Sequence, residues 1–117
     1  MNVNTRGTFL CIKYCIPYLS KSKNPQILTI APPLYMVQDK GNWFKRVCTG
    51  YTTAKYGMTL LTYGMSAELK DINIGCNCLW PRTTIATAAV QNLLGGEKAM
   101  KTSRRPEIMA DAAYIIL

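Results

Sequence analysis

The fold class of this chain is decided by residues Thr52 to Trp80, which read TTAKYGMTLLTYGMSAELKDINIGCNCLW. Apolar side chains recur in the first part of this stretch at spacings of three and four, which predicts an amphipathic helix over residues 52–69. These side chains are Ala54, Met58, Leu61, Met65 and Leu69. The largely apolar run at residues 74–80 then predicts a buried strand, which Pro81 ends.

A second strand is predicted ahead of this helix, at residues 26–30, because β-branched residues are enriched in strands. Two apolar stripes predict another helix over residues 5–19. A strand, a helix and a strand in this order predict a right-handed crossover between parallel strands. Two parallel strands are only part of a sheet that helices normally cover on both faces. We therefore predict an α/β fold, a partial Rossmann-like doubly wound parallel sheet with a strand-helix-strand core and flanking helices.

The remaining segments carry weaker signals. Residues 34–50 have few regular cues and are expected to form a loop. A short helix is predicted over residues 85–94, closed by Gly95-Gly96, and an exposed basic linker over residues 98–105. Pro106 introduces a last predicted helix at residues 108–117. With 117 residues, the chain is expected to form a single partial domain over residues 1–117.

The amino-acid composition excludes several kinds of catalytic and binding site. The chain has no histidine, which excludes Ser-His-Asp catalysis and imidazole metal ligands. Its five cysteines form no Cys-x-x-Cys pair, so we expect free thiols in a reducing compartment and no metal site. The net charge of +8 comes from basic residues in scattered loops without interleaved aromatic residues, so no nucleic-acid binding is expected. No apolar run reaches the roughly 20 residues of a membrane span.

One pair of residues points to a specific chemistry. Tyr51 and Lys55 are spaced so that the phenol and the ammonium lie on one side of the predicted helix. A nearby ammonium favours the phenolate, so we expect a lowered pKa for Tyr51 and a role as general acid. The alternative is an amphipathic residue at a helix start beside a solvated lysine. Asn4 likewise has a structural alternative, as the N-cap of the first helix.

Several motifs, in this order along the chain, resemble those of the short-chain dehydrogenase/reductase family. They are Asn4-Thr5-Arg6-Gly7, Tyr51-Thr52-Thr53-Ala54-Lys55 and Asn77-Cys78-Leu79-Trp80-Pro81. Within the family the chain most resembles the hydroxysteroid dehydrogenase-like branch, in segments spread over nearly its whole length. These segments include Cys15-Ile16-Pro17-Tyr18-Leu19, Pro32-Pro33-Leu34 and Asp111-Ala112-Ala113-Tyr114.

The resemblance implies an NAD- or NADP-dependent oxidoreductase that acts on a carbonyl or an alcohol. Tyr51 would exchange the proton at the substrate oxygen, and Lys55 would bind the ribose hydroxyls of the cofactor. Asn4 would hold a water that links Lys55 to solvent. Further contacts to the cofactor would come from Pro81, Thr84 and Thr87.

The sequence also departs from the family pattern. A Ser is expected at the end of the strand before Tyr51, but residues 30–33 read Ile-Ala-Pro-Pro. Arg82 stands where most of the family has Gly, and the loop before Tyr51 is several residues longer than usual. None of the eight glycines forms a Gly-x-Gly-x-x-Gly turn, the pyrophosphate-binding element of dinucleotide folds.

We therefore expect a truncated catalytic domain that lacks its N-terminal nucleotide-binding half, with weak or no turnover. The alternative is a non-catalytic interaction fragment that associates through helices 5–19 and 52–69 with itself or with a full-length relative. An intracellular location is expected. The resemblance suggests peroxisomes or mitochondria, although the sequence shows neither an Arg-rich leader nor a C-terminal Ser-Lys-Leu signal.

Overall fold

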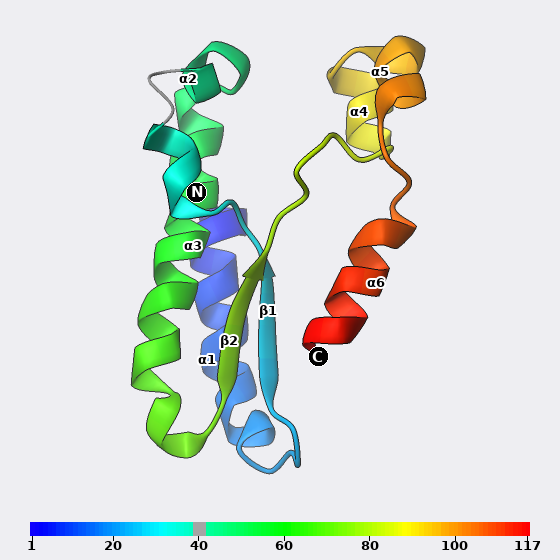
Figure 1. Ribbon diagram of the computed structural model, residues 1–117. Helices are drawn as coiled ribbons and strands as arrows, with labels where there is room; N and C mark the ends of the chain where they lie inside the picture. Colours follow the sequence, from blue (N-terminus) through cyan, green and yellow to red (C-terminus); the bar gives the residue numbers. More distant parts are fainter. Residues whose placement is uncertain (39–41) are drawn as a thin grey trace. The chain divides into compact units, whose positions relative to one another are not determined.

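The computed structural model describes residues 1–38 and 42–117, and the chain divides into two compact units that are described separately (Figure 1). The first unit comprises Met1–Trp80 and the second Pro81–Leu117. The first contains η1 (Asn2–Arg6), α1 (Gly7–Leu19), β1 (Gln26–Ile30), η2 (Leu34–Gln38), α2 (Asn42–Arg46), α3 (Thr49–Glu68), η3 (Lys70–Ile72) and β2 (Gly75–Leu79). The second contains α4 (Ala88–Leu93), α5 (Gly96–Thr102) and α6 (Glu107–Ile116).

The predicted strand-helix-strand centre is confirmed. Strands β1 and β2 pair in parallel, in a register that runs from Gln26 opposite Gly75 to Ile30 opposite Leu79. The connection between them contains α3, the helix predicted over residues 52–69, and α1 lies beside α3 (Figure 1). The observed β1 has the predicted bounds, and β2 is one residue shorter at each end than the predicted strand. The α/β fold class is therefore confirmed.

The core of the first unit lies where α1 and α3 meet the sheet. Four buried side chains form its centre, Ile12, Met65, Leu69 and Ile74. The helix period of 3.6 and the strand period of two both direct apolar side chains to this place. Two threonines are buried near it, and the hydroxyls of Thr29 on β1 and Thr62 on α3 lie 2.9 Å apart. The two hydroxyls therefore share a hydrogen bond where water is excluded.

The N-terminal helix begins differently from the prediction. Its α-helical part starts at Gly7, and the residues before it form the π-helical turn η1. The hydroxyl of Thr5 donates a 3.0 Å hydrogen bond to the carbonyl of Ala54 on α3. A side-chain contact with a distant helix therefore fixes this turn, which a local sequence pattern does not reveal.

The prediction of a loop over residues 34–50 is wrong for most of the residues there that the structure describes. The structure forms η2 and α2 there, and α3 begins at Thr49 because the amide of Thr52 donates a 3.0 Å bond to the carbonyl of Cys48. At the start of η2, the amide of Met36 bonds the carbonyl of Pro33. Residues 39–41, which the expected loop includes, lie outside the described part.

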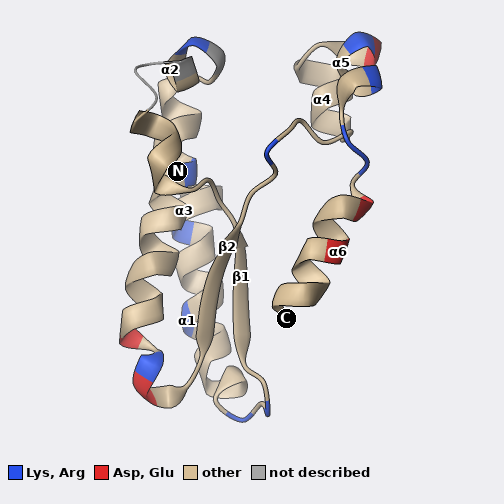
Figure 2. Ribbon diagram, viewed as in Figure 1, with Lys and Arg blue, Asp and Glu red and all other residues tan. Residues whose placement is uncertain are grey.

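The second unit confirms two predicted helices and corrects a linker. The helix predicted over residues 85–94 is shorter, because Ile85 forms a parallel bridge with Arg104 instead of joining α4. The basic segment at residues 98–105, expected to be a linker, lies largely in α5, where Figure 2 colours the ribbon blue at basic residues. Gly95 and Gly96 have φ values of 123° and 60°, which turn the chain so that a new helix starts. The single-domain interpretation stays a prediction.

Among the residues that the structure describes, every helix is too short or too polar to span a bilayer.

Candidate active site

Tyr51 and Lys55 lie one turn apart at the N-terminal end of α3, so their side chains share one face of the helix. The ammonium of Lys55 donates a 2.9 Å hydrogen bond to the carbonyl of Ile30, the last residue of β1. Tyr51 is 41% exposed and Lys55 is half-buried. The pair therefore lies at the carboxyl end of the parallel strands, the edge at which open α/β sheets bind their ligands.

Two tryptophans complete this end of the first unit. The ammonium of Lys55 lies 5.7 Å from the centre of the Trp80 ring, within the range of a cation–π interaction. Trp43 on α2 contacts Trp80, with 6.4 Å between the ring centres. Sequence reasoning assigned no role to either indole. The one available signal was the position of Trp80 at the end of a strand, directly before Pro81.

The pKa of Tyr51 differs in direction from the expectation. Burial raises the pKa of Tyr51 above its ordinary value, and burial lowers the pKa of Lys55. The expected lowering of the Tyr51 pKa is wrong here, because burial of the phenol raises it. Tyr51 is therefore protonated at neutral pH, which is the state required of a proton donor.

Asn4 lies inside η1, the turn that Thr5 ties to Ala54 on α3. The N-cap alternative for Asn4 is wrong, since the turn begins after Met1 and Asn4 is its central residue. Ala54 directly precedes Lys55, so η1 lies against the part of α3 that carries the Tyr51 and Lys55 pair. Single π-helical turns occur frequently at functional sites. The role of Asn4 in holding a water stays a prediction.

The other three candidate residues belong to the second unit. The Thr84 hydroxyl lies 3.0 Å from that of Ser103, and the Thr87 hydroxyl accepts a 3.4 Å bond from the amide of Val90. Thr87 is therefore the N-cap of α4, a structural role that leaves its hydroxyl proton free to donate. Contacts of Pro81, Thr84 and Thr87 with a cofactor stay predictions.

The end of β1, where the family pattern has Ser, reads Ile30-Ala31-Pro32-Pro33, and Ala31 in this segment is 1% exposed. The prolines that follow are held by α3: the Thr59 hydroxyl donates a 2.7 Å bond to the carbonyl of Pro32, and the Tyr56 hydroxyl donates a 3.2 Å bond to that of Pro33. The backbone after β1 is thus well fixed. The methyl group of Ala31 nevertheless offers no hydrogen bond to a substrate.

A groove of about 540 Å³ opens between α1 and β1, and Ile30 and Lys55 belong to its lining. Most of the remaining lining is apolar or carries thiols, including Ile12, Cys11 and Cys15 on α1. Within the described residues, no three His, Cys, Asp or Glu side chains are grouped to hold a metal ion.

The fold and this pair define a class of protein. The sequence pattern of the family described as short chain dehydrogenase matches residues 1–98, and the chain belongs to this family. Among its relatives is hydroxysteroid dehydrogenase-like protein 2 of Xenopus laevis, which is 53% identical over 117 residues. The human protein of the same name is 52% identical over 116 residues, 99% of this chain. The predicted resemblance to the hydroxysteroid dehydrogenase-like branch is confirmed.

Solved structures of similar sequence have the same fold as this chain. A short chain dehydrogenase from Mycobacterium thermoresistibile superposes with a TM-score of 0.80 at 50% identity, over 97% of this chain and 39% of that one. A protein from Xanthomonas campestris gives a TM-score of 0.83 at 47% identity, over 98% of this chain and 40% of the other. The chain spans 27% of the Xenopus laevis relative and 26% of the human one.

Proposed function

We propose that this chain carries the proton-transfer part of an NAD- or NADP-dependent oxidoreductase that acts on a carbonyl or an alcohol. The observation that carries this proposal is the position of Tyr51 and Lys55, one turn apart on α3 at the carboxyl end of β1. Family membership supports an oxidoreductase fold. The substrate class and the cofactor are part of the proposal.

In the direction of carbonyl reduction, the hydroxyl of Tyr51 donates its proton to the substrate oxygen as the carbonyl carbon gains a hydride. A bound nicotinamide supplies that hydride. The phenolate left on Tyr51 is stabilised by the Lys55 ammonium one turn away. Oxidation of an alcohol runs the same transfers in reverse, so Tyr51 must then start as the phenolate, which its raised pKa disfavours.

The residues of this chain fit only one part of a dinucleotide. An ammonium has three N–H donors, and Lys55 uses one on Ile30, so two are available for ribose hydroxyls. The pyrophosphate has no Gly-rich turn to receive it in these 117 residues. Ala31 removes one hydrogen bond to the substrate oxygen. We therefore propose weak or no turnover for this chain by itself.

Titration with NADH and NADPH, followed by nicotinamide fluorescence, tests this proposal. We expect weak binding that Lys55→Met abolishes and that Lys70→Met leaves unchanged, since Lys70 is an exposed lysine in η3 at the far end of α3. Micromolar binding that survives Lys55→Met would contradict the proposed role of Lys55. Micromolar binding that Lys55→Met does abolish would show that the Gly-rich turn is dispensable.

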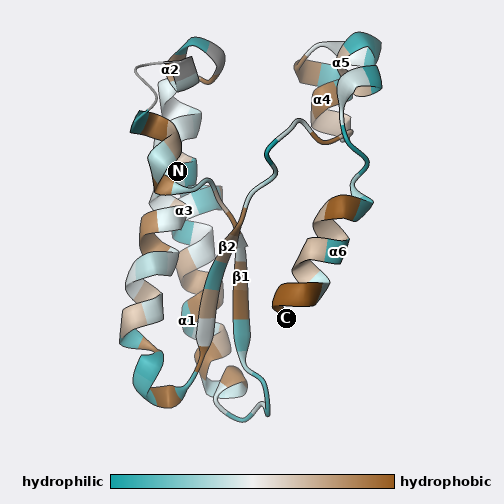
Figure 3. Ribbon diagram, viewed as in Figure 1, coloured by the Kyte–Doolittle hydropathy of each residue, from teal (hydrophilic) through white to brown (hydrophobic). Residues whose placement is uncertain are grey.

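A second candidate function, association through α1 and α3, is favoured by exposed apolar side chains on both helices. Tyr14 is 67% exposed on α1, and Tyr63 is 72% exposed on α3. The apolar segments of both helices are brown in Figure 3. Exposed patches of this kind often mark interaction sites. These helices correspond to residues 5–19 and 52–69, and the proposed partner is a second copy or a full-length relative.

Light scattering, with and without a full-length relative, tests the association. We expect Tyr63→Glu to reduce any complex, because it places a charge among apolar contacts, and Lys70→Glu to have no such effect. A folded monomer that binds no relative would contradict this second candidate.

A further inference from the structure

The charge of Lys55 is held without a carboxylate. The salt bridge between Arg105 and Glu107 lies in the second unit and does not involve Lys55. Lys55 instead bonds the Ile30 carbonyl and lies over the face of Trp80. A lysine side chain has four carbon–carbon bonds to fix, and ordering it costs up to about 2 kcal/mol of rotamer entropy. Its partners therefore decide where the ammonium lies.

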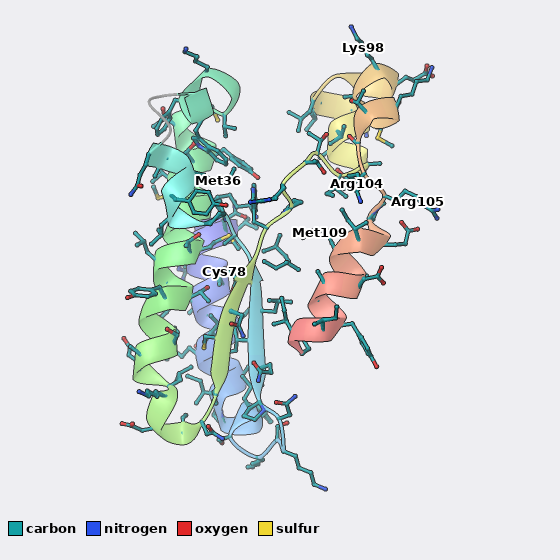
Figure 4. The ribbon with its side chains drawn as sticks, viewed as in Figure 1. Met36, Cys78, Lys98, Arg104, Arg105 and Met109 are labelled. Atoms are coloured by element: carbon teal, nitrogen blue, oxygen red, sulfur yellow. The ribbon has the colours of Figure 1, made fainter. Side chains whose placement is uncertain are left out.

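The position of Trp80 follows from the alternation of side chains along β2. Cys76 packs against the core, and Cys78 (Figure 4), two residues on, lies beside Thr62 of α3. Because side chains alternate between the faces of a strand, Trp80 continues this row on the side of α3. Pro81 also restricts the backbone of Trp80 to extended conformations. The indole is therefore placed by the strand itself.

Trp43 also contacts this indole. The ring N–H of Trp43 donates a 2.7 Å hydrogen bond to the hydroxyl of Thr52, which is 5% exposed. That hydroxyl gives its own proton to the carbonyl of Cys48 at 3.0 Å, so it can only accept from Trp43. The ring of Trp43 then meets Tyr56 edge-on at 5.8 Å and Trp80 at 6.4 Å. A continuous set of contacts thus runs from Thr52 to Lys55.

We infer that Trp80 is a positioning residue for Lys55, and that Trp43 holds Trp80 in place for this task. The inference rests on the proposed function, because Lys55 has a functional role only as the partner of Tyr51. An indole face attracts an ammonium without neutralising it and does not titrate. A carboxylate partner would cancel the positive charge that a Tyr51 phenolate needs. The aromatic contact therefore positions Lys55 and leaves its charge and two of its N–H donors in use.

The test is an NMR measurement on isotopically labelled lysine in the whole chain, with the Lys55 signal assigned through Lys55→Met. A ring above the ammonium shifts the adjacent methylene protons of Lys55 upfield. We expect Trp80→Leu to abolish this shift and Trp80→Phe to retain part of it, because Phe keeps an aromatic face. Thr52→Val removes the acceptor for Trp43 while keeping both indoles, and we expect a reduced shift. Leu69→Met, a change in the core at the far end of α3, is the matched control and leaves the shift unchanged.

A Lys55 signal in Trp80→Leu that equals the wild-type signal would overturn the inference, and so would equal effects of Leu and Phe, which would indicate packing alone. If Trp80→Leu does not fold, Thr52→Val decides, and an unchanged shift there would overturn the part assigned to Trp43. The measurement needs no cofactor. A wild-type chain that binds neither NADH nor NADPH would therefore contradict the proposed function but not the contact between Trp80 and Lys55.

Discussion

The ammonium of Lys55 and the backbone carbonyl of Ile30 are joined by a 2.9 Å hydrogen bond across 25 residues of sequence. The amide of Ala31 bonds the carbonyl of Leu79 on β2. Since neighbouring residues of a strand direct their backbone groups to opposite edges, the carbonyl of Ile30 faces away from β2. Lys55 therefore satisfies a carbonyl at the free edge of β1 and ties the start of α3 to the end of that strand. This bond sets where the Tyr51 and Lys55 pair can act.

Tyr51 should ionise at a higher pH than an exposed tyrosine, because burial raises its pKa. An alkaline ultraviolet titration of the wild type minus that of Tyr51→Phe isolates this group. Lys55→Met should raise the midpoint further, because it removes the positive charge that favours the phenolate. In the unfolded chain the phenol ionises first, so the stability contributed by this group is present below the ordinary tyrosine pKa. It is lost as the pH rises through the raised pKa.

The reference for this titration is the same chain unfolded in urea, in which the phenol has its ordinary pKa. A midpoint for Tyr51 in the folded chain below this reference would show instead that the ammonium, and not burial, governs the phenol.

Ala31→Ser should increase any carbonyl reductase activity, because it places a hydroxyl at the end of β1 where the family pattern has one. The site is 1% exposed, so the new hydroxyl costs about 1–3 kcal/mol of folding free energy where it lacks a partner. Turnover of a carbonyl substrate with NADPH and urea unfolding measure the two effects separately. Ala31→Val is the matched control, with a larger side chain and no hydroxyl. Equal turnover of the Ser and Val variants would show that the hydroxyl has no role.

The strand at residues 26–30 and the helix that carries Tyr51 and Lys55 could be predicted because each has a strong local pattern. Contacts between distant segments could not be predicted in this way. The hydrogen bond between Trp43 and Thr52 exists only because α2 folds back on α3, and no periodicity in the sequence indicates it. The direction of the Tyr51 pKa likewise depends on how far the folded chain buries the phenol. Spacing in the sequence fixes which residues share a helix face, but only tertiary contacts fix where their charged ends lie.

Thr62→Val should lower the free energy of unfolding by about 1–3 kcal/mol, because it leaves the buried hydroxyl of Thr29 without its partner. Urea unfolding measures the change. The matched control is Thr53→Val on the exposed face of the same helix, which should stay within about 0.5 kcal/mol of the wild type. The double change of Thr29 and Thr62 to Val should recover part of the loss. A double variant less stable than the sum of the two single changes would contradict a paired hydroxyl.

Two glycines of α3, seven residues apart, should respond in opposite directions to alanine. Gly64 has open space where a Cβ would lie, so Gly64→Ala should stabilise the chain by up to about 1 kcal/mol through helix propensity. At Gly57 the new Cβ would lie 2.6 Å from the hydroxyl oxygen of Thr5 and 3.0 Å from its methyl carbon. The clash should outweigh the same gain and leave a net loss of about 1 kcal/mol.

Thermal and urea unfolding of both variants measure this contrast. Thr5→Ala removes the two clashing atoms, so Gly57→Ala should become stabilising in that background. Its hydroxyl bond to Ala54 is lost in both members of that comparison, so the comparison isolates the clash. If Gly57→Ala stabilised the chain with Thr5 intact, η1, which contains Asn4, would not be held against α3.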